Sequence, residues 1–342
     1  MLRRKLSRIR HLFERKAIAL MYHRIADIAV DPWQIAVSSI NFEQHLQVLK
    51  KRYKVISVNQ LINQIGTKSI SSNNICLTFD DGYRDNYLTA KPLLEKYQCP
   101  ASFFIPTEYI GLEEQYWWDE LQTIILSSAE LPASLSILIH EKLFEFQLES
   151  PATLTPNELK KQQSWTWLDK PPTQRCELYL ALWERLQPLS NNELNSTLRK
   201  IKLWANFNEP GCRENFPMTS QQLNNIGSHP LFEIGIHTVT HSCLPFHSME
   251  VQYKEITDCK QNLENNLGRP INTIAYPYGN YNDITLNIIK NQKLTAFSCD
   301  EWVITNRANP LRLGRFQVRN WTGEEFERQL FNWINNSRFH YV

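Results

Sequence analysis

A parallel β-α-β unit is the feature of this sequence that most restricts its fold. The apolar run 75–79 is predicted to be a buried strand, residues 87–97 a helix, and residues 100–105 the next buried strand. Strands joined through a helix run parallel, and a parallel sheet has to be covered on both of its faces. The chain is therefore expected to be an α/β protein with its polar chemistry at the carboxyl ends of the strands.

Similar strand and helix patterns flank this unit. Strands are predicted at 17–22, 55–58, 232–237, 271–276, 294–299 and 311–316, with helices between most of them. Residues 107–218 interrupt this alternation, and because a structureless loop of that length would be exceptional, we expect a helical insertion subdomain. The predicted organisation is a basic amphipathic helix at 1–16, an α/β domain formed by 17–106 and 219–342, and the insertion between its two parts.

Two polar motifs follow predicted strands. Asp80 and Asp81 come directly after Phe79, and His237 and His241 end and follow the strand at 232–237. Because side chains alternate along a strand, the adjacent carboxylates can take different roles, one binding a metal and the other moving a proton. Two histidines at this spacing and one carboxylate form the open three-ligand site of catalytic zinc. Alone, Asp-Asp-Gly also fits a solvated turn and His-x-x-x-His fits structural histidines, but their joint occurrence favours a functional site.

These two motifs carry a family resemblance. Thr78-Phe-Asp-Asp-Gly and His237-Thr-Val-Thr-His resemble the polysaccharide deacetylases, the NodB-homology group of metal-dependent carbohydrate esterases, over roughly residues 17–106 and 219–320. The resemblance implies an irregular seven-stranded (β/α) barrel in which Asp81, His237 and His241 hold a divalent metal and Asp80 is the general base. Zinc is the expected metal, and this ligand set would also accept Co²⁺, Ni²⁺ or Fe²⁺.

One position of the family pattern is changed near the base. The arginine that usually orients the base, two residues before Pro277, is replaced by Ala275. Arg24, Arg84 and Arg315 are the candidates to take its place, and the sequence leaves the choice among them open.

The general acid also departs from the pattern. Many members supply it from a late Leu-x-x-His motif, which is Leu311-Arg-Leu-Gly here. We expect His23, at the end of the first strand, to protonate the leaving amine. The backbone N–H of Tyr278, in the turn Tyr-Pro-Tyr-Gly, is the expected donor to the oxyanion.

The run Tyr116-Trp-Trp in the insertion has two interpretations. It fits a platform on which sugar rings stack, and it fits an apolar anchor that fastens the insertion to the barrel. Cys243, close to His241, is not expected to be a metal ligand, because two histidines and an aspartate already complete the usual set.

Composition and charge restrict the partners. The chain has 342 residues, 42% of them hydrophobic, and a net charge of +2, which gives no reason to expect nucleic acid. The expected partner is an acetylated glycan or a lipid-linked glycan precursor, from which an N-acetyl group of an N-acetylhexosamine is removed. Alternatives are hydrolysis of an O-acetyl ester or another amide, and glycan binding without catalysis. Seven scattered cysteines and the lack of a recognisable signal segment favour the cytoplasm. Residues 1–16 fit a helix in peripheral contact with the inner membrane face, and they equally fit a solvated terminal helix docked by its apolar stripe.

Overall fold

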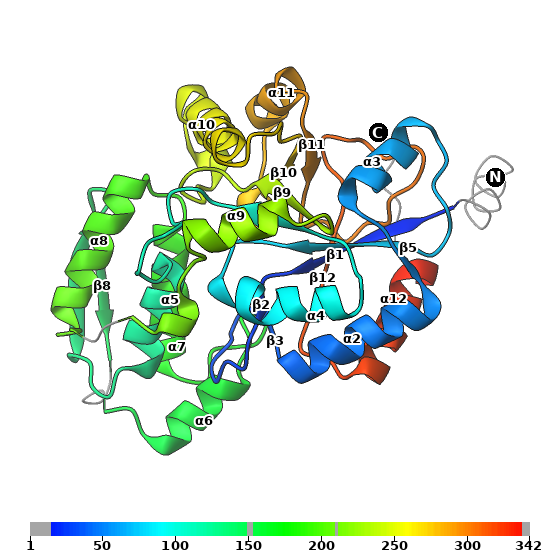
Figure 1. The fold of residues 1–342 in the computed structure, drawn as a ribbon. Coiled ribbons are helices and arrows are strands. Elements are labelled where there is room, and N and C mark those ends of the chain that lie inside the picture. The colour runs from blue at the N-terminus through cyan, green and yellow to red at the C-terminus, as the bar shows by residue number, and fades with distance from the viewer. Residues whose placement is uncertain (1–14, 149–152, 209–210, 337–342) are drawn as a thin grey trace, which may run out of the picture.

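A curled, parallel sheet forms the centre of the protein (Figure 1). The computed structural model describes residues 15–148, 153–208 and 211–336, so most of the basic helix predicted at 1–16 lies outside the described residues. Seven strands follow the order β11-β10-β9-β6-β5-β1-β12, and β4 pairs with β5 off this path. Their bounds are β1 Ala17–Tyr22, β4 Lys54–Val55, β5 Asn74–Phe79, β6 Ala101–Ile105, β9 Phe232–Ile236, β10 Thr273–Ala275, β11 Thr295–Phe297 and β12 Phe316–Gln317. The predicted α/β barrel of seven strands is confirmed.

The central strands are buried on both faces. Every residue of β1, β5 and β6 is buried, as expected for a parallel sheet with helices on its outer side and side chains filling its inner side. The ladder between β1 and β5 pairs Ala17 with Asn74 and runs to Tyr22 paired with Phe79. Asp80 N donates to Tyr22 O and His237 N donates to Ile105 O, so the hydrogen bonding continues into both polar motifs.

Helices cover the outside of this sheet (Figure 1). Their apolar faces contribute to the main core, for example through Phe42, Leu46 and Leu49 of α2. Side-chain caps define several of their starts, and Gly268 in the left-handed conformation ends the longest, α10. The bounds are α2 Ser39–Arg52, α3 Val58–Gly66, α4 Lys91–Lys96, α9 Ser220–Ser228, α10 Met249–Leu267, α11 Asp283–Asn291 and α12 Gly323–Asn336. A short parallel pair, β2 Arg24–Ile25 and β3 Ala36–Val37, lies beyond the end of β1.

The segment between β6 and α9 has a hydrophobic cluster of its own. It contains α5 Trp117–Gln122, α6 Pro156–Ser164, α7 Gln174–Leu186 and α8 Asn191–Trp204. It also contains an antiparallel hairpin, β7 Ser134–Ile139 and β8 Lys142–Gln147, which the helical prediction missed because its alternating residues are only half apolar. Tyr83, which follows the Asp-Asp-Gly motif, belongs to this cluster. The segment therefore packs against the end of the barrel that carries the polar motifs.

Candidate active site

Three predicted metal ligands converge at the carboxyl ends of β5 and β9. One ligand atom each from Asp81, His237 and His241 lies within 4.8 Å of the others, and all three residues are buried. The Nε2 atoms of His237 and His241 each lie 3.3 Å from Asp81 Oδ1. Asp81 thus meets two histidines that follow it by 156 and 160 positions in the sequence.

The chemistry of these donors fits a divalent metal. His237 Nδ1 lies 2.8 Å from the Ala275 carbonyl oxygen, to which it donates when protonated, so its Nε2 carries the free lone pair. Asp81 Oδ1 is buried and no N–H or O–H donates to it in the described part of the chain. Burial by itself would raise the pKa of Asp81, but contact with the two imidazoles holds it well below its usual range. The site therefore offers an anionic oxygen and two imidazole nitrogens, a donor set that can bind a divalent metal ion.

The backbone at this site is held in conformations that most residues avoid. Asp81, Thr238, His241 and Tyr278 have φ values of 70°, 65°, 58° and 58°. Such left-handed residues persist only where surrounding contacts enforce them. Tyr116 OH donates to the Asp81 carbonyl, and Glu255 Oε2 accepts from the backbone N–H of residues 239 and 240. These contacts fix the two ligand-bearing turns.

Asp80 points to a different partner from its neighbour. Arg315 donates from both terminal nitrogens to its carboxylate, at 2.6 Å to Oδ1 and 2.7 Å to Oδ2, and both side chains are buried. Burial raises the pKa of Asp80, but the charge and hydrogen bonds of Arg315, together with the nearby His237, lower it overall. The carboxylate is therefore ionised and fixed in orientation, as a general base requires.

This pair selects one of the three candidate arginines. Arg24 binds Asp85 at 3.0 Å and Asn215 at 2.7 Å, and Arg84 packs on the ring of Phe216. Arg315 alone among them contacts Asp80 in the described residues. Arg315 directly precedes β12, Phe316–Gln317, instead of lying within the strand predicted at 311–316, so that part of the secondary-structure prediction is displaced.

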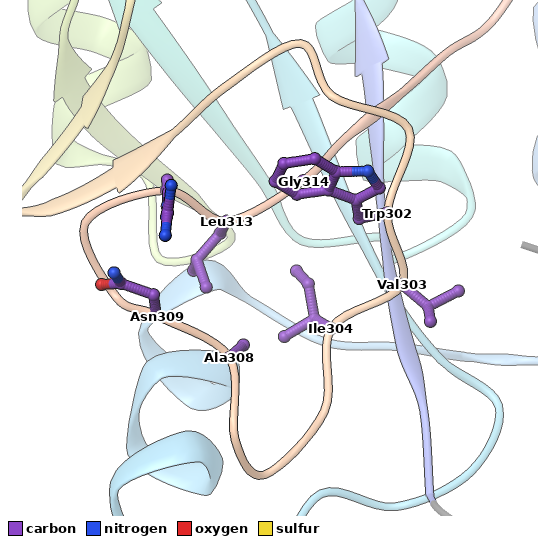
Figure 2. A pocket seen from close by; sticks show the side chains of 8 residues that line it. Trp302, Val303, Ile304, Ala308, Asn309, Leu313 and Gly314 are labelled. Atoms are coloured by element: carbon purple, nitrogen blue, oxygen red, sulfur yellow. The ribbon is translucent and has the colours of Figure 1, made fainter. Parts of the chain in front are cut away.

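The loop before Arg315 is closely packed. Arg315 Nε donates to Ser298 O at 3.1 Å and its backbone N–H donates to Asp300 O at 2.9 Å. A Cβ on Gly314 would lie 2.6 Å from Asp300 O and 2.7 Å from Trp302 O, so this approach needs glycine. Figure 2 shows the hollow beside this loop, lined by Trp302, Asn309 and Leu313 among others. None of the predicted metal ligands lines this hollow, so it is not the candidate active site.

His23 and Tyr278 also lie at this end of the barrel. His23 is half-buried directly after β1, and the carbonyl of its neighbour Tyr22 accepts a hydrogen bond from Asp80 N, so His23 adjoins the strand ends that carry the two carboxylates. Its Nδ1 is buried and has no hydrogen-bond partner among the described residues. The ring of Tyr278 packs edge-on against His241, with the centroids 4.6 Å apart.

A buried carboxyl that the sequence reasoning missed lies in the insertion. Asp119 Oδ2 accepts from Tyr83 OH at 2.8 Å, and Tyr83 OH accepts from Trp118 Nε1 at 2.7 Å. Burial raises the pKa of Asp119 to about 7.

The tryptophans before Asp119 fit the anchor interpretation, because Trp117 and Trp118 are only 4% and 8% exposed. Trp118 also contacts the ring of His241, with the centroids 4.7 Å apart. Asp119 comes directly after Tyr116-Trp-Trp, and this position is the sequence signal that could have identified it.

Comparison with known proteins identifies the relatives of this arrangement. The family described as polysaccharide deacetylase matches residues 67–131 and 186–297, which include Asp80, Asp81, His237, His241 and Tyr278. The chain belongs to the polysaccharide deacetylase family. The gap in the match, 132–185, lies within the insertion.

Relatives of known sequence share a limited part of the chain. YxkH of Bacillus subtilis, which is named as a polysaccharide deacetylase, is 33% identical over 94 residues, 27% of this chain and 32% of that protein. The poly-β-1,6-N-acetyl-D-glucosamine N-deacetylase of Escherichia coli is 31% identical over 86 residues, 25% of this chain and 13% of that enzyme. The matches therefore span a third or less of these relatives.

Solved deacetylase structures share the fold over nearly the whole chain. IcaB from Ammonifex degensii superposes with a TM-score of 0.55 at 16% identity, covering 94% of this chain and 97% of that one. The deacetylase PplD of Streptococcus pyogenes superposes with a TM-score of 0.53 at 20% identity, covering 92% and 98%. At these identities the similarity shows the fold and nothing further.

Proposed function

We propose that this polysaccharide deacetylase family member is a metal-dependent hydrolase that removes N-acetyl groups from N-acetylhexosamine units of a glycan. The observation that carries the proposal is the division of labour between adjacent carboxylates. Asp81 faces two histidines and Asp80 faces Arg315. Two adjacent aspartates with a purely structural role would not be expected to have such different partners. The name of the E. coli relative, an N-deacetylase of an N-acetylglucosamine polymer, supports the same reaction.

Each residue has a role in this hydrolysis. Asp81, His237 and His241 would hold the metal, which when bound polarises the acetyl carbonyl and makes water more acidic. Asp80, ionised and oriented by Arg315, accepts the proton of the attacking water. The backbone N–H of Tyr278 donates to the developing oxyanion, and His23 gives a proton to the leaving amine nitrogen. The products are acetate and a free amine on the sugar.

The departures from the family pattern do not favour binding without catalysis. Glycan binding without catalysis would be favoured if nothing replaced the arginine absent at Ala275 and the histidine absent from Leu311-Arg-Leu-Gly. Arg315 supplies the first function at Asp80, and His23 is available at the same face for the second. Hydrolysis of an O-acetyl ester would use the same residues, and its alcohol leaves more easily than an amine. The acetate-release experiment below therefore includes an ester substrate.

Acetate release provides the test. Purified protein loaded with Zn²⁺ should release acetate from N-acetylglucosamine oligomers, and Asp80→Asn should abolish release while elemental analysis shows unchanged metal content. His237→Ala should lose the metal as well. Release from acetylated xylan but not from the oligomers would replace the amide reaction by ester hydrolysis. Full activity of Asp80→Asn would overturn the mechanism.

The expected location of the enzyme follows from the expected form of its substrate. We propose a cytoplasmic enzyme, with peripheral contact at the inner membrane face, acting on a glycan or a lipid-linked precursor. Among the described residues, none of the helices combines the length and apolarity needed to cross a bilayer. Removing residues 2–16 should lower the membrane-bound fraction in a flotation assay with anionic vesicles, and an unchanged fraction would contradict the membrane contact.

A further inference from the structure

His241 differs from His237 in how its ring is oriented. His237 Nδ1 lies 2.8 Å from the Ala275 carbonyl oxygen, an acceptor of the kind that usually orients a metal-binding histidine. His241 Nδ1 is buried and has no hydrogen-bond partner among the described residues. Ring contacts surround His241 instead, with centroids 4.7 Å from Trp118, 4.6 Å from Tyr278 and 4.8 Å from His237. Its orientation therefore depends on how these neighbouring rings are held.

Hydrogen bonds fix the position of Trp118. Its Nε1 donates to Tyr83 OH at 2.7 Å, and Tyr83 OH donates to Asp119 Oδ2 at 2.8 Å. A hydroxyl has one proton to give, so the acceptor at Asp119 directs that proton away from the indole and leaves a lone pair for Trp118. All three side chains are buried, so each of these polar groups needs its partner.

Tyr83 lies between the two ends of the insertion. Trp118 and Asp119 contact its hydroxyl from the first end. Arg24 lies over the ring of Tyr83, 4.4 Å from the centroid, and donates to Asn215 Oδ1, near the second end, at 2.7 Å. Because the ring is packed in this way, the hydroxyl has a fixed position from which to hold the indole.

The same turn of the insertion also reaches Asp81. Tyr116 OH donates to the Asp81 carbonyl oxygen. The ring of Tyr116 is stacked on Trp118, with the centroids 4.6 Å apart and an angle of 9° between the planes. Residues 116–119 therefore contact two of the three candidate ligands, which follow different strands.

We propose that Asp119, Tyr83 and Trp118 are positioning residues that hold the His241 imidazole in the orientation needed for metal binding. Metal affinity then depends on how the insertion packs against the barrel. This inference rests on the proposed metal-dependent function. Without a hydrogen bond at Nδ1, the imidazole can turn about its side-chain bonds, and the indole beside it limits that rotation. A ligand held in place binds more tightly because less freedom is lost on binding.

Metal affinity, measured without substrate, provides the test. Tyr83→Phe keeps the ring and removes the hydroxyl, so the dissociation constant for Zn²⁺, measured by competition with a chelator, should rise about tenfold. Tyr179→Phe is the matched control, because Tyr179 is buried in the same hydrophobic cluster and its hydroxyl accepts from Trp33 Nε1, also at 2.7 Å. Both variants lose an indole–hydroxyl bond and should have a lower Tm, but only Tyr83→Phe should bind Zn²⁺ more weakly. Equal affinities in the two variants would overturn the inference.

Substitutions at Asp119 separate the role of a hydrogen-bond acceptor from that of a charge. Asp119→Asn retains a carbonyl oxygen that can accept from Tyr83 OH, so its Zn²⁺ affinity should stay within about twofold of that of the parent protein. Asp119→Leu has no acceptor and should weaken binding about as much as Tyr83→Phe. Equal losses in both Asp119 variants would show that its charge acts on the metal, which would contradict the positioning role.

The route through Trp118 has a test of its own. Trp118→Phe keeps an aromatic ring against His241 but lacks the indole N–H, so adding Tyr83→Phe to it should weaken Zn²⁺ binding no further. An undiminished effect of Tyr83→Phe in the Trp118→Phe protein would show that Tyr83 acts by another route and would overturn the inference. The absorption bands of the Co²⁺-loaded protein report the geometry of the ligands, and they should shift in Tyr83→Phe and not in Tyr179→Phe.

The proposed reaction can fail separately from this inference. If the parent protein binds Zn²⁺ but releases no acetate, the proposed deacetylation is wrong, and the Zn²⁺ affinities still decide the role of Tyr83. If the parent protein binds neither Zn²⁺ nor Co²⁺, both proposals are wrong.

Discussion

Arg315 binds both carboxylate oxygens of Asp80 across 235 residues of sequence. The pair is buried, so the arginine charge acts through little water and holds the pKa of Asp80 down against the effect of burial. Asp80 therefore has a different environment from its neighbour Asp81, which faces the two histidines.

Replacing Arg315 should impair the base without removing the metal ligands. Arg315→Lys keeps the charge but loses the two-pronged geometry, so we expect kcat to fall about 10- to 100-fold with little change in KM. The pKa of Asp80 should rise, which moves the acidic limb of the pH–kcat profile to higher pH. Arg84→Lys is the control, because Arg84 packs on Phe216 and not on Asp80. Equal effects of both substitutions would contradict the assignment.

The role of His23 can be isolated with a leaving group that needs no proton. His23→Gln should reduce acetate release from N-acetylglucosamine oligomers about 10²- to 10⁴-fold. Hydrolysis of p-nitrophenyl acetate should be much less affected, since its phenolate leaves unprotonated. Metal content serves as the control. A parallel loss on both substrates would assign His23 to another step.

Metal binding should stabilise the folded protein. At a free Zn²⁺ concentration 100 times the dissociation constant, the gain is about 2.7 kcal/mol and Tm should rise by several degrees. His237→Ala should abolish this shift. His229→Ala should retain it, because His229 pairs with Glu95 at 3.1 Å, apart from the site. Differential scanning calorimetry with and without a chelator measures all three proteins, and a zinc-dependent shift in His237→Ala would show that the ion binds elsewhere.

Two glycines should respond in opposite ways to the same substitution. Gly314→Ala places a methyl group against two backbone oxygens and should displace the loop that holds Arg315, at a cost of about 1–3 kcal/mol. Gly66→Ala, with nothing within 4 Å, should be neutral or stabilise by about 0.5–1 kcal/mol. Urea unfolding compares them. Stability of Gly314→Ala equal to that of the parent protein would show that the loop adjusts freely.

A buried histidine away from the site should make the protein sensitive to acid. Burial lowers the pKa of His45 from 6.5 to about 4, and its Nε2 lies 2.7 Å from Trp321 O. The unfolded chain binds a proton at this histidine at higher pH than the folded protein does. The contribution of neutral His45 to the free energy of unfolding is therefore fully present above pH 6.5 and is lost as the pH falls toward 4. The loss is roughly 3 kcal/mol. Urea unfolding at several pH values should show a shallower slope for His45→Gln than for the parent protein.

The secondary-structure patterns were readable from the sequence where they are local. The apolar run before Asp80 and the one ending at His237 each predicted a buried strand followed by polar chemistry, and parallel strands present their carboxyl ends at one edge. The antiparallel hairpin β7–β8 was missed, because its half-exposed alternation is weak beside the helical patterns around it.

The sequence by itself determined the parallel α/β plan and the four residues at the centre of the site, since strand periodicity and strand-end motifs are local properties. Only the tertiary structure decided that Arg315, rather than Arg24 or Arg84, holds Asp80, and that Trp118 of the insertion packs against His241. The physical reason is that these contacts join segments far apart in the chain. Which distant side chains meet depends on how the loops and the insertion pack, and no local pattern encodes that.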